Sequence, residues 1–426
     1  MNGHALVVGG GIGGLLAAHA LAHRVQRVTL LERDHYPADS DAQGPPARRG
    51  APQSRCLHLL MAAGAAAIDE LMPGWREQLT ALGAISFDAS ADAVRCGASG
   101  WLPRTPSGIT TYASSRALLE RVMRCGLPAA VRVREGCRVV GLLGSRAAGV
   151  DGVRLVDENG HESVMSADLV VDASGSGSML PAWLGALPGA GLAVEETAVP
   201  SGTRYVSRWF HLAAADAPDW CCLAVAPAVH RGWRGAMMLR AERDFWGVVL
   251  VSCRDESMPG DSADFDRFVA DLGDGMLQRA LVRATAVSPV HHYPSGSSRM
   301  KHYERVTDWP PRLMAIGDGV CALDPYFGLG MTAAARGAVL LRAALDPDRG
   351  PARSGLDFQR ELAILNAGPW RLATGRDADG GLAGEVEAHR ARLYAAAPMR
   401  DDIAHALLGV EHLLRPMESL MQLSLE

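Results

Sequence analysis

The feature that most constrains this sequence is a glycine-rich turn near its N-terminus. Residues 5–8 form an apolar run that predicts a buried strand, and residues 15–22 are rich in alanine and leucine and predict a helix. The turn between them has the spacing G-x-G-x-x-G and consists of Gly9, Gly10, Gly11, Ile12, Gly13 and Gly14. In this motif the first glycine permits a tight turn, the second lets the backbone approach a pyrophosphate, and the third lets helix and strand pack closely. The sequence therefore predicts a helix start that binds the phosphates of a dinucleotide.

An acidic residue completes this N-terminal unit. A second apolar run, residues 28–31, ends at Glu32, about 20 residues after the glycine motif. A carboxylate at this place can accept hydrogen bonds from the hydroxyls of an adenosine ribose. Strand, helix, second strand and acid together predict a βαβ unit that binds an ADP-containing dinucleotide, and the alternative is a purely structural turn. The motif alone leaves the choice between NAD and FAD open.

Composition and charge exclude several classes of protein. Lys plus Arg total 42 and Asp plus Glu total 47, so the net charge of −5 provides no excess of cations for nucleic acid. Glycines interrupt the apolar stretch of residues 5–21, so we expect no membrane span, and membrane association is not expected. We expect no signal peptide either, because the stretch lacks a basic n-region. The eight cysteines form no CxxC pair, which favours reduced thiols and a cytoplasmic location. We expect no metal site, because the adjacent His291 and His292 would point to opposite faces of a strand.

The rest of the chain alternates between helix and strand patterns. The segments that extend the first unit are residues 114–125, 131–140, 150–156, 168–172, 312–316 and 328–345. Between about residues 200 and 300, short β-branched and aromatic runs predict a second sheet. Residues 355–426 predict helices whose leucines could cover a pocket or lie on a membrane. Because this tail has no Lys/Arg-rich belt, packing on its own protein is favoured.

A second glycine-rich turn follows the strand at residues 312–316. Gly317 and Asp318 end the strand, and Pro325, Gly328, Gly330 and Met331 then lead into the long helix. This arrangement resembles the second FAD motif of the flavoprotein monooxygenases with a glutathione-reductase-like fold, the type of para-hydroxybenzoate hydroxylase. The resemblance implies that Asp318 binds the ribityl chain. It also implies that the turn after the proline presents backbone N–H groups to the flavin ring.

Further segments match the same family. Arg116, at the start of the predicted helix 114–125, resembles the family's helix arginine that approaches FAD, and Arg33 directly after Glu32 also fits. Residues 48–58 resemble a loop of bacterial flavin-dependent epoxidases and hydroxylases of natural-product pathways. The resemblance therefore implies the following cofactor-binding residues: Gly9, Gly11, Ile12, Gly13, Gly14, Glu32, Arg33, Arg48, Gln53, Arg116, Val139, Asp318, Pro325, Gly328, Gly330 and Met331.

The resemblance and the patterns together imply an α/β fold with three parts. A Rossmann-like FAD-binding domain comprises residues 1–195 and 300–350. An interleaved β-sheet substrate domain comprises residues 196–299, and a helical C-terminal region comprises residues 351–426. Six aromatic residues of the sheet could line a substrate pocket, although core packing is favoured for each alone: Trp209, Phe210, Trp220, Trp233, Phe245 and Trp246. No catalytic residue is assigned, and the candidates are Tyr326, His58, Gln53 and Arg299.

The resemblance implies an FAD-dependent monooxygenase of secondary-metabolite biosynthesis. Reduced FAD would capture O2 as a C4a-(hydro)peroxide and insert one oxygen atom, by epoxidation or hydroxylation, into a small, largely apolar intermediate. The alternatives are an FAD-dependent reductase or dehydrogenase of the same fold, such as a prenyl-chain reductase, and a flavin-binding redox sensor without turnover. Flavin-dependent halogenases share the fold, but their Trp-x-Trp-x-Ile-Pro segment is absent. Since no second G-x-G-x-x-G unit is visible, electrons would come from transiently bound NAD(P)H or from a partner flavin reductase.

Overall fold

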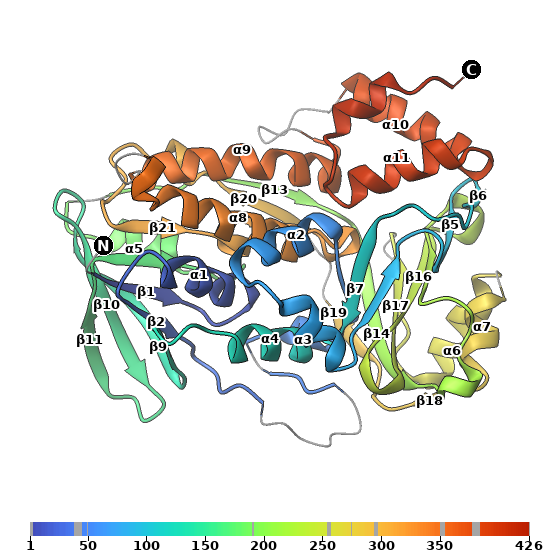
Figure 1. Cartoon of the computed structure of the whole chain (residues 1–426), viewed down its shortest axis with the longest axis horizontal. Helices are drawn as coiled ribbons and strands as arrows, with labels where there is room; N and C mark the ends of the chain where they lie inside the picture. Colours follow the sequence, from blue (N-terminus) through green and yellow to red (C-terminus); the bar gives the residue numbers. More distant parts are fainter. Residues whose placement is uncertain are drawn as a thin grey trace.

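The computed structural model describes residues 3–37, 45–48, 50–189, 191–253, 257–273, 275–293, 297–349, 354–376 and 384–425. A parallel sheet with flanking helices fills the centre, a second, larger sheet stands beside it, and the C-terminal helices lie along one side (Figure 1). The predicted mixed α/β fold class, with a Rossmann-like unit, further sheets and a helical C-terminal region, is confirmed.

The first sheet has five parallel strands in the order β21-β12-β1-β2-β8. Its strands are β1 (His4–Val8), β2 (Arg27–Leu31), β8 (Val131–Arg134), β12 (Leu169–Asp172) and β21 (Leu313–Ala315). The residues of β12 and β21 are all buried, as is usual where helices or a second layer cover both faces of a parallel sheet. Because all five strands run the same way, the turns after β1, β2, β12 and β21 meet at one edge.

Helices and a small antiparallel sheet cover this core. The helices of this part are α1 (Ile12–Ala22), α2 (Ala62–Leu71), α3 (Trp75–Ala81), α4 (Arg116–Cys125), α5 (Leu180–Ala186) and α8 (Gly330–Ala344). Helix α1 packs against α8, and both are rich in alanine, which allows helices to approach closely. The antiparallel sheet consists of β9 (Cys137–Ser145), β10 (Gly149–Asp157) and β11 (Glu162–Ser166), and its apolar side chains share the same core.

The second sheet has eight strands. They are β5 (Ala93–Gly97), β6 (Gly100–Trp101), β14 (Arg204–His211), β15 (Cys222–Val225), β16 (Arg234–Arg240), β17 (Phe245–Ser252), β18 (Thr285–Ala286) and β19 (His291–Tyr293). One face packs against α6 (Ser262–Asp271) and α7 (Met276–Leu281). Strand β5 pairs with β15 in parallel, so this sheet also includes a segment from before residue 196, which our sequence boundaries did not anticipate. The pairing is non-local, and local patterns do not reveal it.

Aromatic side chains of this sheet form its core. Trp209, Phe210, Trp220, Phe245 and Trp246 are all buried, and the rings of Trp220 and Trp246 meet edge to face with centroids 5.5 Å apart. These five residues therefore have the packing role that the sequence favoured for each alone.

Two three-stranded sheets connect the larger parts. One is formed by β3 (His58–Leu60), β7 (Thr110–Ser114) and β4 (Ile85–Asp88). The other is formed by β13 (Glu196–Pro200), β20 (Ser297–Lys301) and β22 (Cys321–Ala322). In this second sheet of three strands, β20 pairs on one side with β22, which precedes the glycine-rich turn of residues 325–330. On its other side β20 pairs with β13, which leads in the chain to β14 of the eight-stranded sheet.

The C-terminal region is helical and packs on its own protein. Its helices are α9 (Gly355–Thr374), α10 (Gly384–Ala396) and α11 (Asp401–Glu411). Leu407, Met417 and Leu420 form an apolar cluster with Leu329 and with the partly buried Phe327. The tail thus covers the outside of the second glycine-rich turn. None of the helices among the described residues is both long and apolar enough to cross a membrane.

A histidine joins this tail to helix α2. His412 ends α11, and its Nδ1 accepts a hydrogen bond from the backbone N–H of Ala62 at 3.1 Å. Its carbonyl oxygen accepts another from Ala63 at 3.2 Å. Helix α2 has no side-chain cap of its own, so His412 supplies the acceptors for its first turn. Burial, and then the charge of Arg95, lowers the pKa of His412 to about 4, which keeps Nδ1 free to accept.

We expect the His412 contact to make stability depend on pH. The unfolded imidazole binds a proton near its ordinary pKa of 6.5 and the folded one near 4, so stability is lost as pH falls through this window. An asparagine offers a similar acceptor that does not titrate. Relative to His412→Asn, the wild type should lose about 3 kcal/mol between pH 6.5 and 4, since one pKa unit corresponds to about 1.4 kcal/mol. Urea unfolding at several pH values measures this, with exposed His230→Asn as control. Parallel curves for wild type and His412→Asn would contradict it.

Candidate functional site

The site is built around the glycine-rich turn after β1. Gly9 has φ +99°, and a Cβ there would lie 2.7 Å from the carbonyl oxygen of Ala173. A Cβ on Gly14 would overlap the carbonyl oxygen of Gly9. Both positions therefore exclude side chains, because β1, α1 and the turn after β12 meet there.

Gly11 and Gly13 differ from these two glycines. A Cβ on Gly11 would meet only Nη2 of Arg116, at 3.5 Å, and one on Gly13 would meet only Cβ of Ala334, at 3.8 Å. The protein's own packing therefore leaves room at both positions. Helix α1 begins here with no side-chain cap, so its first N–H groups face that room. Uncapped N–H groups beside open space provide an anion-binding site.

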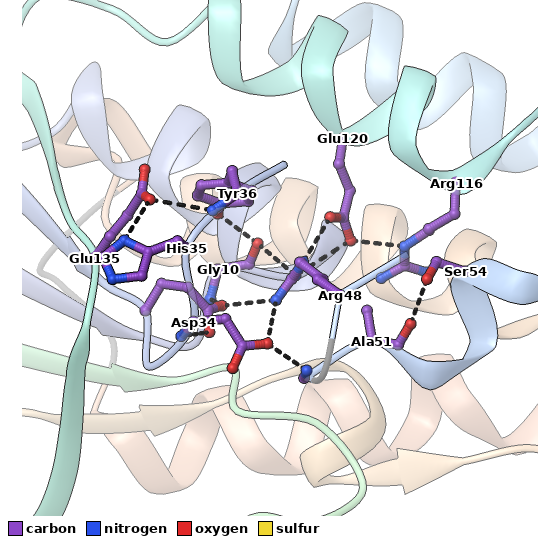
Figure 2. A network of polar contacts seen from close by, with 12 residues as sticks. Gly10, Asp34, His35, Tyr36, Arg48, Ala51, Ser54, Arg116, Glu120 and Glu135 are labelled. Carbon is purple, nitrogen blue, oxygen red and sulfur yellow. Dashed lines mark hydrogen bonds and ion pairs between the residues drawn. The ribbon is translucent and has the colours of Figure 1, made fainter. Parts of the chain in front are cut away.

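Buried charges surround this turn (Figure 2). Glu32 accepts hydrogen bonds from the backbone N–H of Gly10 at 2.7 Å and of Asp34 at 2.9 Å. Nη1 of Arg48 lies 3.3 Å from Glu32, and its Nε donates to Glu120 at 3.1 Å. The structure thus places Glu32 at the end of β2, where the sequence predicted an acid, but also shows that the chain itself engages both of its oxygens.

Glu120 joins two arginines in this group. It accepts from Arg48 and also from Nε of Arg116 at 2.7 Å, and all three side chains are buried. Although burial opposes it, the charges of Glu120 and Glu32 raise the pKa of Arg48. We call Glu32, Arg48, Arg116 and Glu120 the arginine cluster. It holds two guanidinium groups beside the uncapped start of α1, which is chemistry suited to a phosphate-bearing ligand.

Tyr36 is a member of the site that our sequence reasoning missed. Its hydroxyl donates to the carbonyl oxygen of Gly10 at 2.6 Å. Its ring lies 5.2 Å from the guanidinium of Arg48 and 4.9 Å from that of Arg124. An aromatic residue four positions after the acid was the available signal, but only the fold places it against the glycine turn.

The second glycine-rich turn lies after β21. Asp318 belongs to the short turn Gly317–Gly319, Gly328 has φ +65°, and Gly330 begins helix α8. A Cβ on Gly330 would meet only Oδ1 of Asp318, at 3.6 Å. Room therefore remains between this helix start and Asp318, as it does at Gly11.

Asp324 anchors this second turn and is a residue that our sequence reasoning also missed. Its carboxylate accepts from the backbone N–H of Tyr326 at 2.9 Å, which caps the short helix Pro325–Phe327. It also accepts from Thr203 at 2.7 Å and from the hydroxyl of Tyr205, both in or next to β14. The signal was an Asp directly before a Pro, which is typical of a helix start.

Burial shifts the pKa values of three side chains near the turns. Asp318 and Tyr326 are exposed and His58 is half-buried, yet burial raises the pKa of Asp318 and of Tyr326 and lowers that of His58. Burial, and then Arg116, lowers the pKa of His58 to about 3, so its imidazole is neutral at ordinary pH.

A pocket of about 300 Å³ adjoins the second turn. Its lining comprises Val199, Pro200, Ser201, Thr203, Pro227, Trp233, Cys253, Ser298, Asp324, Tyr326, Phe327, Ala373 and Thr374. Tyr326 is the member that the sequence named as a catalytic candidate, and Trp233 is the member from the six aromatic residues.

Other predicted residues lie elsewhere. Arg299 is exposed on β20, 3.9 Å from Glu196, while the adjacent Ser298 faces the pocket, because neighbours in a strand alternate between faces. Arg33 is exposed, and Val139 is buried in β9. The remaining residues have these places: Gln53 is half-buried in the turn Pro52–Arg55, Pro325 begins the short helix before Gly328, and Ile12 and Met331 pack in or against the core.

Known proteins share this fold. The model of the NAD(P)-binding Rossmann-like domain matches residues 7–52. PqsL of Pseudomonas aeruginosa, described as a probable FAD-dependent monooxygenase, is 19% identical, with a TM-score of 0.64 over 96% of this chain and 99% of PqsL. The flavin-dependent brominase Bmp2 is 15% identical, with a TM-score of 0.66 over 96% and 93% of the two chains. The 2-methyl-3-hydroxypyridine-5-carboxylic acid oxygenase is 16% identical, with a TM-score of 0.62 over 97% of this chain and 98% of the oxygenase.

These likenesses confirm the predicted fold, which this chain shares with PqsL, Bmp2 and the pyridine-carboxylic acid oxygenase. Protein Rv3254 of Mycobacterium tuberculosis is 34% identical over 369 residues, which are 80% of this chain and 73% of that protein. The chain belongs to the family of Rv3254.

We expect the glycines of the first turn to separate into two kinds. Gly14→Ala should lower the free energy of unfolding by several kcal/mol, because the new methyl group overlaps a backbone carbonyl that cannot move away. Gly11→Ala should change it by less than about 1 kcal/mol, because the methyl group makes only ordinary contact with a side chain. Thermal and urea unfolding of the two variants measure the difference. Equal losses for both would show that no room exists at Gly11.

Proposed function

We propose that this protein is an FAD-dependent monooxygenase. The observation that carries the proposal is the position of Arg116 between the two glycine-rich turns. Its Nη2 lies 3.5 Å from the place of a Cβ on Gly11, and its charge opposes the rise in the pKa of Asp318. It also contributes to the low pKa of His58. One guanidinium thus lies beside the open start of α1, and its charge also acts on Asp318 beside the start of α8, as a cofactor with phosphates at one end and a ring at the other would require.

The residues present fit FAD. The uncapped start of α1 and the arginine cluster would hold the pyrophosphate, because both supply donors to anions. Glu32 would reach the adenosine ribose, and Asp318 would bind the ribityl chain. The start of α8 at Gly330 would face the flavin ring, and its dipole would stabilise negative charge there.

When bound and reduced, FAD would supply the reaction with O2. The role of the protein is to exclude water and to hold the substrate near the flavin ring. The C-terminal cluster around Leu329 and Phe327 covers the outer side of the second turn. The Nδ1 of His58 lies 3.1 Å from the carbonyl oxygen of Cys56 and donates to it. The low pKa keeps this ring neutral, so its Nε2 would accept a hydrogen bond from a substrate or ring without adding charge. Asp324 keeps the Pro325–Phe327 turn in place and thereby orients Tyr326 along the pocket.

We propose a small and largely apolar substrate that is epoxidised or hydroxylated. Proline, valine, alanine and aromatic side chains form much of the pocket wall, and hydroxyl groups of Ser201, Thr203 and Ser298 supply polar contacts. NAD(P)H or a partner flavin reductase would supply the electrons. A reductase or dehydrogenase on the same fold is the alternative that the experiments below distinguish.

We expect the purified protein to take up FAD without a covalent bond. Gly330→Val should fold with unchanged thermal stability but lose bound flavin, because its side chain enters the room in front of Asp318. Gly260→Val is the matched control, since no atom lies within 4 Å of that position and it lies outside the site. Absorbance and acid extraction measure the flavin. A wild type that cannot be loaded with FAD, or equal flavin in both variants, would overturn the assignment.

We expect oxygen transfer to be the net reaction. The FAD-loaded enzyme should be reduced, mixed with a panel of neutral phenols and polyenes, and exposed to labelled O2. Mass spectrometry of a turned-over compound should show one labelled oxygen atom. A product that differs only by two hydrogens and carries no label would indicate the reductase or dehydrogenase instead.

A further inference from the structure

The turn between β16 and β17 carries a buried carboxylate. Glu242 belongs to the short helix Glu242–Asp244, which connects β16 and β17 of the second sheet, and only 7% of its surface is exposed. Its Oε2 accepts a hydrogen bond from the backbone N–H of Ser115 at 2.9 Å, and its Oε1 accepts one from the Ser115 hydroxyl. A buried carboxylate is costly unless it is hydrogen-bonded, so this two-point contact is what makes its burial tolerable.

Ser115 is the residue that caps helix α4. Its hydroxyl oxygen accepts from the backbone N–H of Leu118 at 3.1 Å while its hydroxyl hydrogen points to Glu242. Both roles of the hydroxyl are therefore used, and the rotamer of Ser115 is determined. Glu242 thus holds the first turn of a helix that belongs to the other part of the molecule.

The turn that presents Glu242 is strained. Arg243 and Asp244 follow it with φ +56° and +55°, a region that residues other than glycine rarely adopt. Several contacts hold this conformation: the Asp244 carbonyl accepts from Leu212 at 3.0 Å, and Arg240 pairs with the Asp244 carboxylate at 3.2 Å. A strained conformation that the surroundings maintain is commonly found at functional sites.

The residue directly after Ser115 is Arg116. Its guanidinium belongs to the arginine cluster and lies against the open side of Gly11. Any rotation of the first turn of α4 would move this guanidinium away from the turn. The contact with Glu242 therefore holds the backbone from which Arg116 extends, while Glu120 holds its guanidinium.

We propose that Glu242 is a positioning residue for the dinucleotide site, through which the second sheet sets the place of Arg116. This inference rests on the proposed binding of FAD. Glu242 contributes no contact to the ligand itself. It contributes a fixed start of α4, so that Arg116 need not be reordered when the ligand binds.

The test is a double-mutant cycle on FAD affinity. The dissociation constants of FAD, and of ADP as a probe of the phosphate end, are measured by fluorescence quenching and by calorimetry. The proteins are the wild type, Glu242→Ala, Arg116→Gln and the double variant. Glu242→Ala should weaken FAD binding about 10-fold or more, in the range for a hydrogen bond to a charged group. In the Arg116→Gln background the same change should weaken it less than about 2-fold, because the guanidinium it positions is gone.

Two further variants separate positioning from stability. Glu242→Gln retains the shape and one acceptor, so it should bind FAD within about 3-fold of wild type even if Glu242→Ala folds poorly. Asp219→Ala is the control. Among the described residues the carboxylate of Asp219 pairs only with Arg104, so its removal should leave FAD affinity unchanged. Melting temperatures are recorded for all of them.

The outcomes distinguish this inference from the proposed function. A wild type that does not bind FAD or ADP would overturn the proposed function and this inference with it. A wild type that binds FAD, with losses from Glu242 and Arg116 variants that simply add, would overturn the positioning role alone. So would a Glu242→Ala variant with a lower melting temperature and unchanged FAD affinity.

Discussion

The close approach of helix α1 to strand β1 is the constraint on which the rest of the site depends. The carbonyl group of Gly9 occupies the place where any side chain of residue 14 would lie, so helix and strand meet backbone to backbone. This contact directs the uncapped N–H groups of α1 to the edge of the parallel sheet where the turns after four strands converge. Without it, the open room at Gly11 would not face the arginine cluster.

Charge is the second element of this arrangement. Two arginines and two glutamates are buried around the glycine turn, and their mutual pairing offsets the cost of removing them from water. Such pairs add little net stability in proteins, and their value here is orientation. Glu120 aligns two guanidinium groups that would otherwise repel each other, and it does so before any ligand arrives.

The two large parts of the molecule are linked at carboxylates. Glu242 of the second sheet holds the start of α4, and Tyr205 and Thr203 hold Asp324 at the turn before α8. Each link joins the second sheet to a helix start beside one of the glycine-rich turns. The second sheet is therefore connected to the turns that would hold a cofactor, and residues just beyond the ends of its strands line the pocket. The C-terminal helices pack over the second turn.

The sequence by itself determined the local parts of this protein. Glycine spacing, apolar runs and the acid after β2 are short-range signals, and they were sufficient to predict the βαβ unit, the second turn and the mixed α/β fold. Arg116, Gly11 and Asp318 were also named from sequence. The structure places Nη2 of Arg116 3.5 Å from the position of a Cβ on Gly11, and Oδ1 of Asp318 3.6 Å from that of a Cβ on Gly330.

Only the tertiary structure decided which distant segments meet. The pairing of β5 with β15, the contact of Tyr36 with Gly10, and the contacts of Glu242 and Asp324 all join residues that no local pattern connects. It also decided that Arg299 faces away from the pocket while its neighbour Ser298 faces it. The physical reason is that the periodicity of a helix or strand depends on residues close together in the sequence, whereas the partner of a buried charge depends on how separate elements pack.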